Sequence, residues 1–128
     1  MKEIRILVVD DHLPFLRSVA AWLATLPGVS HVACAASCHQ ALSLLDRSVP
    51  DLVLTDFHLR GTNGFELTRY VKSKADAACI VIMTLFGSPE FHAKAIRIGA
   101  DHYIDKKHLF YELPRFLAQR FDIGQPSA

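Results

Sequence analysis

Side chains that can bind a metal ion or a phosphoryl group follow four apolar runs that lie far apart in this chain. In chain order they are Asp10, Asp11, Asp56, Thr84 and Lys106. Carboxylates are ligands that Mg²⁺ prefers, and a lysine ammonium or a hydroxyl can donate hydrogen bonds to phosphate oxygens. Brought together, these groups would suit phosphoryl transfer, in which a carboxylate attacks in line while positive charges neutralise the phosphoryl oxygens.

The charge balance of such a cluster predicts a bound cation. Three carboxylates within about 5 Å of one another repel by roughly 3 kcal/mol per pair at an effective dielectric constant near 20. A divalent cation that prefers oxygen ligands is the natural counter-charge, and Lys106 would supply a second one. Asp56 is the expected nucleophile, because it stands alone after an expected central strand and is flanked by apolar Leu54 and Phe57.

Each of these side chains also has an ordinary structural explanation. Asp10 and Asp11 could cap a following helix, Asp56 could belong to a turn, and Lys106 beside Lys107 could be a solvated surface charge. Any one of these explanations suffices for its own residue. The occurrence of all the groups at successive strand ends favours a common site.

Short apolar runs alternate with amphipathic stretches, which predicts strands and helices in turn. The expected strands are residues 4–9, 32–36, 51–55, 79–83 and 102–104. A first helix is expected to end at Pro27-Gly28. The other helix starts and ends are indicated by capping boxes at Ser37 with Gln40 and at Asn63 with Glu66, and by Ser88-Pro89 and Gly99.

The last helix contains a proline. Pro114 is tolerated only in a first turn, so this helix is expected to begin near Phe110 and to run to about Phe121. On this basis Pro114 would shorten the helix and any surface that it forms.

The alternation of elements predicts an α/β fold. Five strands that alternate with five helices through short loops indicate a doubly wound parallel sheet, with strand order 2-1-3-4-5. Ligands of such sheets bind at the carboxyl ends of the strands, at the switch point between strands 1 and 3. This is the edge at which Asp10, Asp11 and Asp56 are expected.

Composition limits the possible functions. The chain has 128 residues, 51% of them hydrophobic, which predicts one domain over residues 1–122 and a tail or linker start at residues 123–128. A formal net charge of +1 provides no overall field for nucleic acid or anionic membrane, and no apolar run is long enough to span a bilayer. Three cysteines without zinc spacing favour a reducing cytoplasm.

Several motifs together resemble the receiver domain of two-component response regulators, over about residues 3–121. The matching segments are Ile6-Leu7-Val8-Val9-Asp10-Asp11, Asp51-Leu52-Val53-Leu54-Thr55-Asp56 with Gly64, Val81-Ile82-Met83-Thr84, and Gly99-Ala100-Asp101-His102-Tyr103-Ile104-Asp105-Lys106. The resemblance implies a flavodoxin-like fold. It implies that the domain is a switch that accepts a phosphoryl group from a sensor histidine kinase or a histidine phosphotransfer protein. The domain itself would not be an enzyme.

The same resemblance implies roles for the acidic cluster. Asp56 would be the phosphoacceptor. Mg²⁺ would be bound by Asp11 and Asp56 directly, by Asp10 through water, and by the backbone carbonyl of His58. Lys106 would hold the phosphoryl group.

It also implies a conformational switch. Thr84 would hold the phosphoryl group and, with Tyr103, change position on phosphorylation. The surface of the fourth helix, fifth strand and fifth helix would change as a result. His58 and Phe86 fall at positions that tune the lifetime of the phosphorylated state. Phosphorylation adds about one negative charge and strong acceptors, so new charge-assisted bonds can drive such a switch.

The sequence departs from the family pattern at several positions, and other functions stay open. Arg60 stands where proline is frequent, Leu85 where a small residue is usual, and Lys107 where proline or aspartate is common. The alternatives are a Mg²⁺-dependent aspartyl-phosphate phosphatase or phosphotransferase, and a partner-binding module that works without phosphorylation.

The expected partners follow from the resemblance. His12 after the acid pair is typical of receivers that precede a helix-turn-helix output domain, so the chain is expected either to stand alone or to regulate transcription as part of a longer protein. A downstream output domain or effector and a phosphorylation-dependent homodimer are expected. No direct nucleic-acid contact is expected from these residues.

Overall fold

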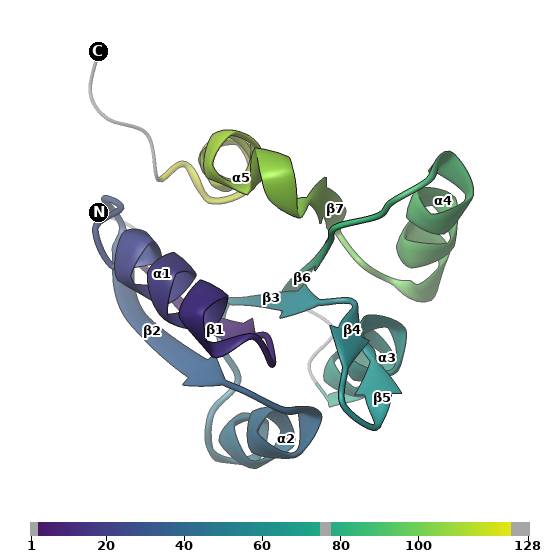
Figure 1. Cartoon of the computed structure of the whole chain (residues 1–128). Helices are drawn as coiled ribbons and strands as arrows, with labels where there is room; N and C mark the ends of the chain where they lie inside the picture. Colours follow the sequence, from purple (N-terminus) through teal and green to yellow (C-terminus); the bar gives the residue numbers. More distant parts are fainter. Residues whose placement is uncertain (1–2, 75–77, 124–128) are drawn as a thin grey trace.

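A single parallel sheet forms the centre of the molecule. The computed structural model describes residues 3–74 and 78–123. Five strands of the described chain pair in the order β2-β1-β3-β6-β7, all parallel (Figure 1). They are β1 (Ile4–Val9), β2 (Val29–Ala35), β3 (Leu52–Asp56), β6 (Cys79–Thr84) and β7 (His102–Asp105). The predicted order, which counted only these five strands, is confirmed.

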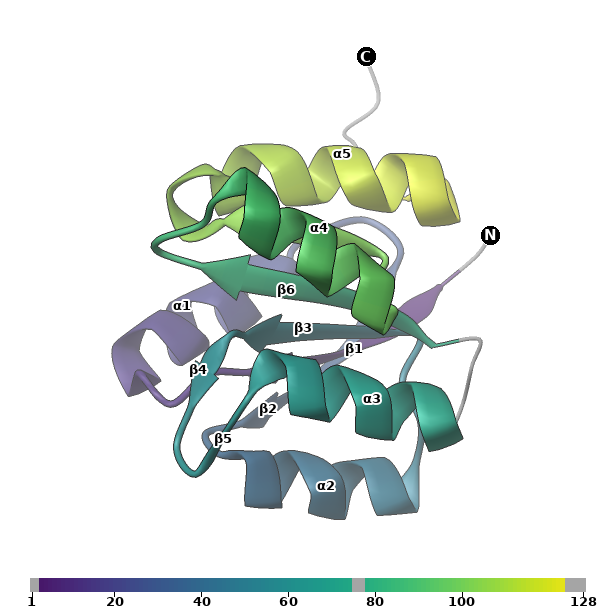
Figure 2. The same ribbon diagram turned by 90° about the vertical axis from the view of Figure 1, so that its right-hand side faces the viewer.

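Helices cover both faces of the sheet, because its strands are apolar on both sides. Helices α1 (Leu13–Leu23) and α5 (Leu109–Phe121) lie on one face, and α2 (Cys38–Arg47), α3 (Gly64–Lys74) and α4 (Pro89–Ile98) lie on the other (Figures 1 and 2). Each face buries its own apolar cluster. Ile123 belongs to the cluster under α1 and α5, so the core extends to the last described residue. The expected tail at residues 124–128 lies outside the described residues.

The predicted helix caps form in the structure. The Ser37 hydroxyl accepts a hydrogen bond from the Gln40 amide at 3.1 Å, and Gln40 Oε1 accepts one from the Ala36 amide rather than from Ser37. Likewise the Ser88 hydroxyl accepts from the Phe91 amide at 3.1 Å. At the other end of α4, Gly99 takes a left-handed conformation with φ of 119°. These caps satisfy amide and carbonyl groups that the helix ends leave unpaired.

Three local predictions were wrong. Helix α1 ends at Leu23, before the expected end at Pro27-Gly28. Helix α5 begins at Leu109, after the 3-10 turn η1 (Lys106–His108) and within one residue of the expected start, but Pro114 lies in its second turn and the helix is not shortened. The missing amide would have bonded to the carbonyl of Phe110, whose side chain is exposed, so water can replace it. The expected loop after β3 instead forms a small antiparallel hairpin of β4 (His58–Leu59) and β5 (Thr62–Asn63).

The hairpin lies beside the carboxyl ends of the strands (Figure 2). Its turn contains Arg60 and Gly61, and Gly61 has a φ of 76°. Among the described residues, no helix combines the length and the apolar character needed to cross a membrane.

Candidate functional site

Strand register brings the predicted side chains to one edge of the sheet. In the β1–β3 pair Val9 lies opposite Thr55, so Asp10 and Asp56 leave their strands side by side. Across the β3–β6 pair Asp56 lies opposite Met83, one residue before Thr84. The pairing of Thr84 with Asp105 then places Lys106 at the same edge.

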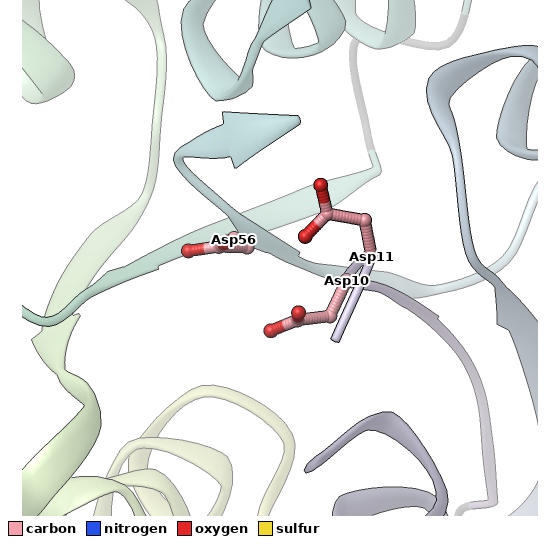
Figure 3. Close-up of side chains that lie close together, drawn as sticks. All are labelled: Asp10, Asp11 and Asp56. Carbon is pink, nitrogen blue, oxygen red and sulfur yellow. The ribbon is translucent and has the colours of Figure 1, made fainter. Parts of the chain in front are cut away.

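The carboxylates of Asp10, Asp11 and Asp56 form a compact acidic cluster. Each offers a ligand oxygen, and these atoms lie within 4.8 Å of one another. Figure 3 shows Asp10 and Asp11 leaving the end of β1 in different directions, with Asp56 beside them at the end of β3. Asp10 and Asp56 are buried, whereas Asp11 is half-exposed. At this spacing each pair repels by about 3 kcal/mol at an effective dielectric constant near 20. Three carboxylates therefore form a donor set that fits a hard divalent cation.

Lys106 joins two of the acids. Its Nζ lies 2.8 Å from Asp10 Oδ2 and 3.4 Å from Asp56 Oδ1, and its side chain is 9% exposed. The ammonium also lies 4.5 Å from the centre of the Phe15 ring, which favours the cation electrostatically. Sequence reasoning identified Lys106 but missed Phe15, because an aromatic residue in the apolar stripe of α1 gives no sign of facing the site.

Both oxygens of Asp10 are already engaged by the protein. Oδ1 accepts a hydrogen bond from the His12 amide at 2.9 Å, and Oδ2 accepts one from Lys106. His12, not an aspartate, is the residue that precedes α1, and its side chain does not cap the helix. The more accessible Asp11 is therefore better placed than Asp10 to bind a cation directly.

Comparison with known proteins agrees with this geometry. Residues 6–117 match the family described as the response regulator receiver domain. The chain belongs to this family. It is 32% identical over 102 residues to the nitrate/nitrite response regulator protein NarL of Escherichia coli (strain K12). The aligned region covers 79% of this chain and 47% of that protein. The chain thus spans less than half the length of that relative.

Solved structures of response regulators are similar to this receiver domain. A LuxR-family two-component response regulator from Aurantimonas sp. SI85-9A1 shares 32% identity with a TM-score of 0.81, over 93% of this chain and 88% of that one. A response regulator from Burkholderia pseudomallei, solved with a phosphorylated aspartic acid, a calcium ion and citrate, shares 26% identity with a TM-score of 0.76. That match covers 89% of this chain and 64% of that one.

The remaining predicted residues of the receiver domain lie around the acidic cluster. Thr84 is buried at the end of β6, where its hydroxyl accepts a hydrogen bond from the Phe86 amide at 3.4 Å. Tyr103 is buried on β7. The side chain of Phe86 is 85% exposed. The side chain of His58 is also exposed, and it is near enough for its charge to act on Asp56. The roles of these four residues stay predictions.

The environment of Asp56 disfavours its charge. Burial is the main cause of a pKa above the ordinary value of 3.8, and the negative charge of Asp10 acts in the same direction. Lys106 opposes both effects by its charge and its hydrogen bond. The receiver domain therefore holds a partly desolvated carboxylate whose charged form is favoured by any added positive charge.

We expect Asp56→Asn to stabilise the cation-free protein in a pH-dependent way. The pKa of Asp56 is higher in the folded protein than in the unfolded chain, so ionisation of Asp56 opposes folding. The wild type therefore loses stability as pH rises from 3.8 through the pKa of the folded state. Below 3.8 the carboxyl is protonated in both states and the loss is absent. The free energy of unfolding of the variant should therefore increasingly exceed that of the wild type as pH rises through this window.

Urea unfolding with a chelator present, at several pH values between 3 and 7, measures this difference. Glu3→Gln, which removes an exposed carboxylate, is the control and should show no such trend. A constant difference between Asp56→Asn and the wild type across this range would contradict the expectation.

Proposed function

We propose that this receiver domain accepts a phosphoryl group on Asp56 from the phosphohistidine of a sensor histidine kinase or a histidine phosphotransfer protein. The observation that carries the proposal is the ion pairing of one buried lysine, Lys106, with two members of a cluster of three carboxylates. A cluster that served only to stabilise the fold would not gather so much like charge, since each pair repels. It suits a site that is completed by a cation and a phosphoryl group.

The chemistry follows from the placement of these groups. A carboxylate oxygen of Asp56 attacks phosphorus in line, the P–N bond to the donor imidazole breaks, and the imidazole nitrogen keeps the electron pair and takes up a proton. Lys106 then neutralises a phosphoryl oxygen that it can reach from its position beside Asp56. The phosphoryl group stays on the chain, so the domain acts as a switch and not as a turnover enzyme.

Mg²⁺ is the proposed cofactor of this step. Asp11 and Asp56, with the backbone carbonyl of His58, would bind it directly, and Asp10 would bind it through water. When bound, Mg²⁺ neutralises charge that develops on the phosphoryl oxygens. The relative from Burkholderia pseudomallei, which carries a phosphorylated aspartic acid and a calcium ion, supports this assignment.

Phosphorylation is proposed to change the surface made by α4, β7 and α5. Thr84 lies on the strand next to Asp56, and its hydroxyl would donate to the new phosphoryl oxygens. Tyr103, on the following strand, would respond to this movement. The exposed Phe86 and His58 would control the access of water and so the lifetime of the acyl phosphate.

The proposed partners are those of two-component signalling. They are a histidine kinase or phosphotransfer protein, an output domain or effector, and a second receiver on phosphorylation. The similarity to NarL and to a LuxR-family regulator supports a role in transcription regulation within a longer protein. Nucleic acid would then be bound by the output domain, and the cytoplasm is the proposed location.

Incubation with a small phosphodonor and Mg²⁺ tests the proposal. The wild type should gain the mass of one phosphoryl group, and peptide mapping under mild conditions should place it on Asp56. A chelator should reduce the uptake at least about tenfold, because the acidic cluster then repels the donor. Equal uptake with and without the cation, or a phosphoryl group on another residue, would contradict the proposal.

A further inference from the structure

The ring of Tyr103 lies inward, in a slot beneath the segment that joins β6 to α4, beside an open pocket that Gly87, His92 and Tyr103 all line. The side chain is 8% exposed. One side of the slot is formed by His92 and Phe91, whose ring centres lie 5.2 and 5.3 Å from that of Tyr103. Residue 87, a glycine, lies against the hydroxyl end of the ring.

Gly87 leaves no space for a side chain. A Cβ atom at this position would lie 2.1 Å from the Tyr103 hydroxyl oxygen, and 2.8 and 2.9 Å from two ring carbons. Gly28, Gly61 and Gly99 have positive φ, but Gly87 does not. Its backbone therefore accepts an alanine, and the conflict arises from the tyrosine ring alone.

The ring cannot move toward Phe91 without displacing other rings. Phe91 also packs against Phe57 and Phe65, with ring centres 4.4 and 5.1 Å away. Phe57 directly follows Asp56 in the chain. Moving Phe91 would therefore disturb an aromatic cluster next to the acidic site, and a side chain at residue 87 would instead drive the Tyr103 ring outward.

Packing makes a large contribution to holding the ring inward. The Tyr103 hydroxyl oxygen is buried and makes no hydrogen bond of full geometry with a described residue, although the Thr84 hydroxyl lies close enough to interact with it. A weakly bonded buried hydroxyl adds little to stability, so contacts of the ring must supply much of the interaction that favours this position. The width of the slot is set by Gly87.

We propose that Gly87 is a positioning residue for Tyr103. Its missing side chain admits the ring to the inward position, and the ring takes this position before any phosphoryl group is present. The consequence for signalling rests on the proposed function: phosphorylation would act on a tyrosine that is already inward. Residue 87 would then set how far the ring position depends on phosphorylation.

A double-mutant cycle tests the contact without any phosphodonor. Gly87→Ala should lower the Tm by about 5 °C in the Tyr103 background, because the methyl group overpacks the slot. In the Tyr103→Leu background the same change should lower it much less, since the ring and hydroxyl are gone. Equal losses in both backgrounds would overturn the proposal.

The position of the ring can be measured directly by ¹⁹F NMR of protein labelled with fluorotyrosine. Tyr→Phe variants assign the three tyrosine resonances, and the shift between H₂O and D₂O reports exposure. In Gly87→Ala only the Tyr103 resonance should become solvent-sensitive. Leu85→Ala, which alters an exposed residue of the same segment, is the control. An unchanged Tyr103 resonance, or the same change in the control, would overturn the proposal.

A last comparison separates this proposal from the proposed function. The ¹⁹F spectrum of the wild type is recorded before and after addition of beryllofluoride and Mg²⁺. A buried Tyr103 resonance before addition supports the inward ground state, and an exposed one overturns it. A wild type that binds no beryllofluoride would refute the proposed function, while the cycle and the effect of Gly87→Ala would still decide the role of residue 87.

Discussion

Asp56→Asn is expected to remove phosphoryl uptake from small phosphodonors, with a loss of at least about 10³-fold in rate. The amide is close in size to the carboxylate, but it has no anionic oxygen to attack phosphorus. It also removes one of the three acids that would bind Mg²⁺. The measurement is the intact mass of wild type and variant after incubation with phosphodonor and Mg²⁺.

Asp51→Asn is the matched control for this experiment. Asp51 is an exposed acid at the opposite end of β3, so its replacement should leave uptake within about twofold of the wild type. Circular dichroism should show both variants folded. Continued phosphorylation of Asp56→Asn at the rate of the wild type would exclude Asp56 as the acceptor and favour a different nucleophile.

Lys106→Met should have the second largest effect, on both uptake and stability. The methionine keeps the apolar stem beside Phe15 but removes the charge that pairs with Asp10 and Asp56. A charge-assisted hydrogen bond contributes about 1.5–3 kcal/mol, so phosphoryl uptake should fall about 10- to 100-fold. Because buried Asp10 loses its partner, the free energy of unfolding should fall by about 3 kcal/mol.

Lys107→Met separates the role of Lys106 from a general effect of charge. Lys107 is adjacent and exposed, so its loss should change the free energy of unfolding by no more than about 0.5 kcal/mol. Urea unfolding with a chelator and single-turnover uptake with Mg²⁺ measure the two effects. If both variants behaved alike, the buried ion pairs of Lys106 would contribute neither to stability nor to transfer.

Local patterns were sufficient to predict most of the elements. The strands that lead to Asp10, Asp56 and Thr84 are nearly continuous apolar runs, with Arg5 the exception in β1, because both faces of a parallel sheet are buried. Capping by Ser37 and Ser88 depends on residues within four positions of each other, so it too is visible in the sequence. These interactions are local, and local interactions are what a sequence pattern records.

Elements that depend on distant neighbours were not predictable in this way. The two-residue strands β4 and β5 have no hydrophobic period to detect. Helix α5 accepts Pro114 because its apolar face packs on the sheet and the lost hydrogen bond falls on the exposed side. Intrinsic propensity alone does not account for that tertiary contribution.

The sequence by itself determined which groups meet at the edge of the sheet, because parallel strands bring their carboxyl ends together whatever the details of packing. It did not determine how those groups pair. Only the tertiary structure decided that Lys106 bridges Asp10 and Asp56, and that residue 87 must be without a side chain for Tyr103 to lie inward. Such contacts join residues that are distant in the chain, and they depend on ångström-scale positions that packing, not residue type, sets.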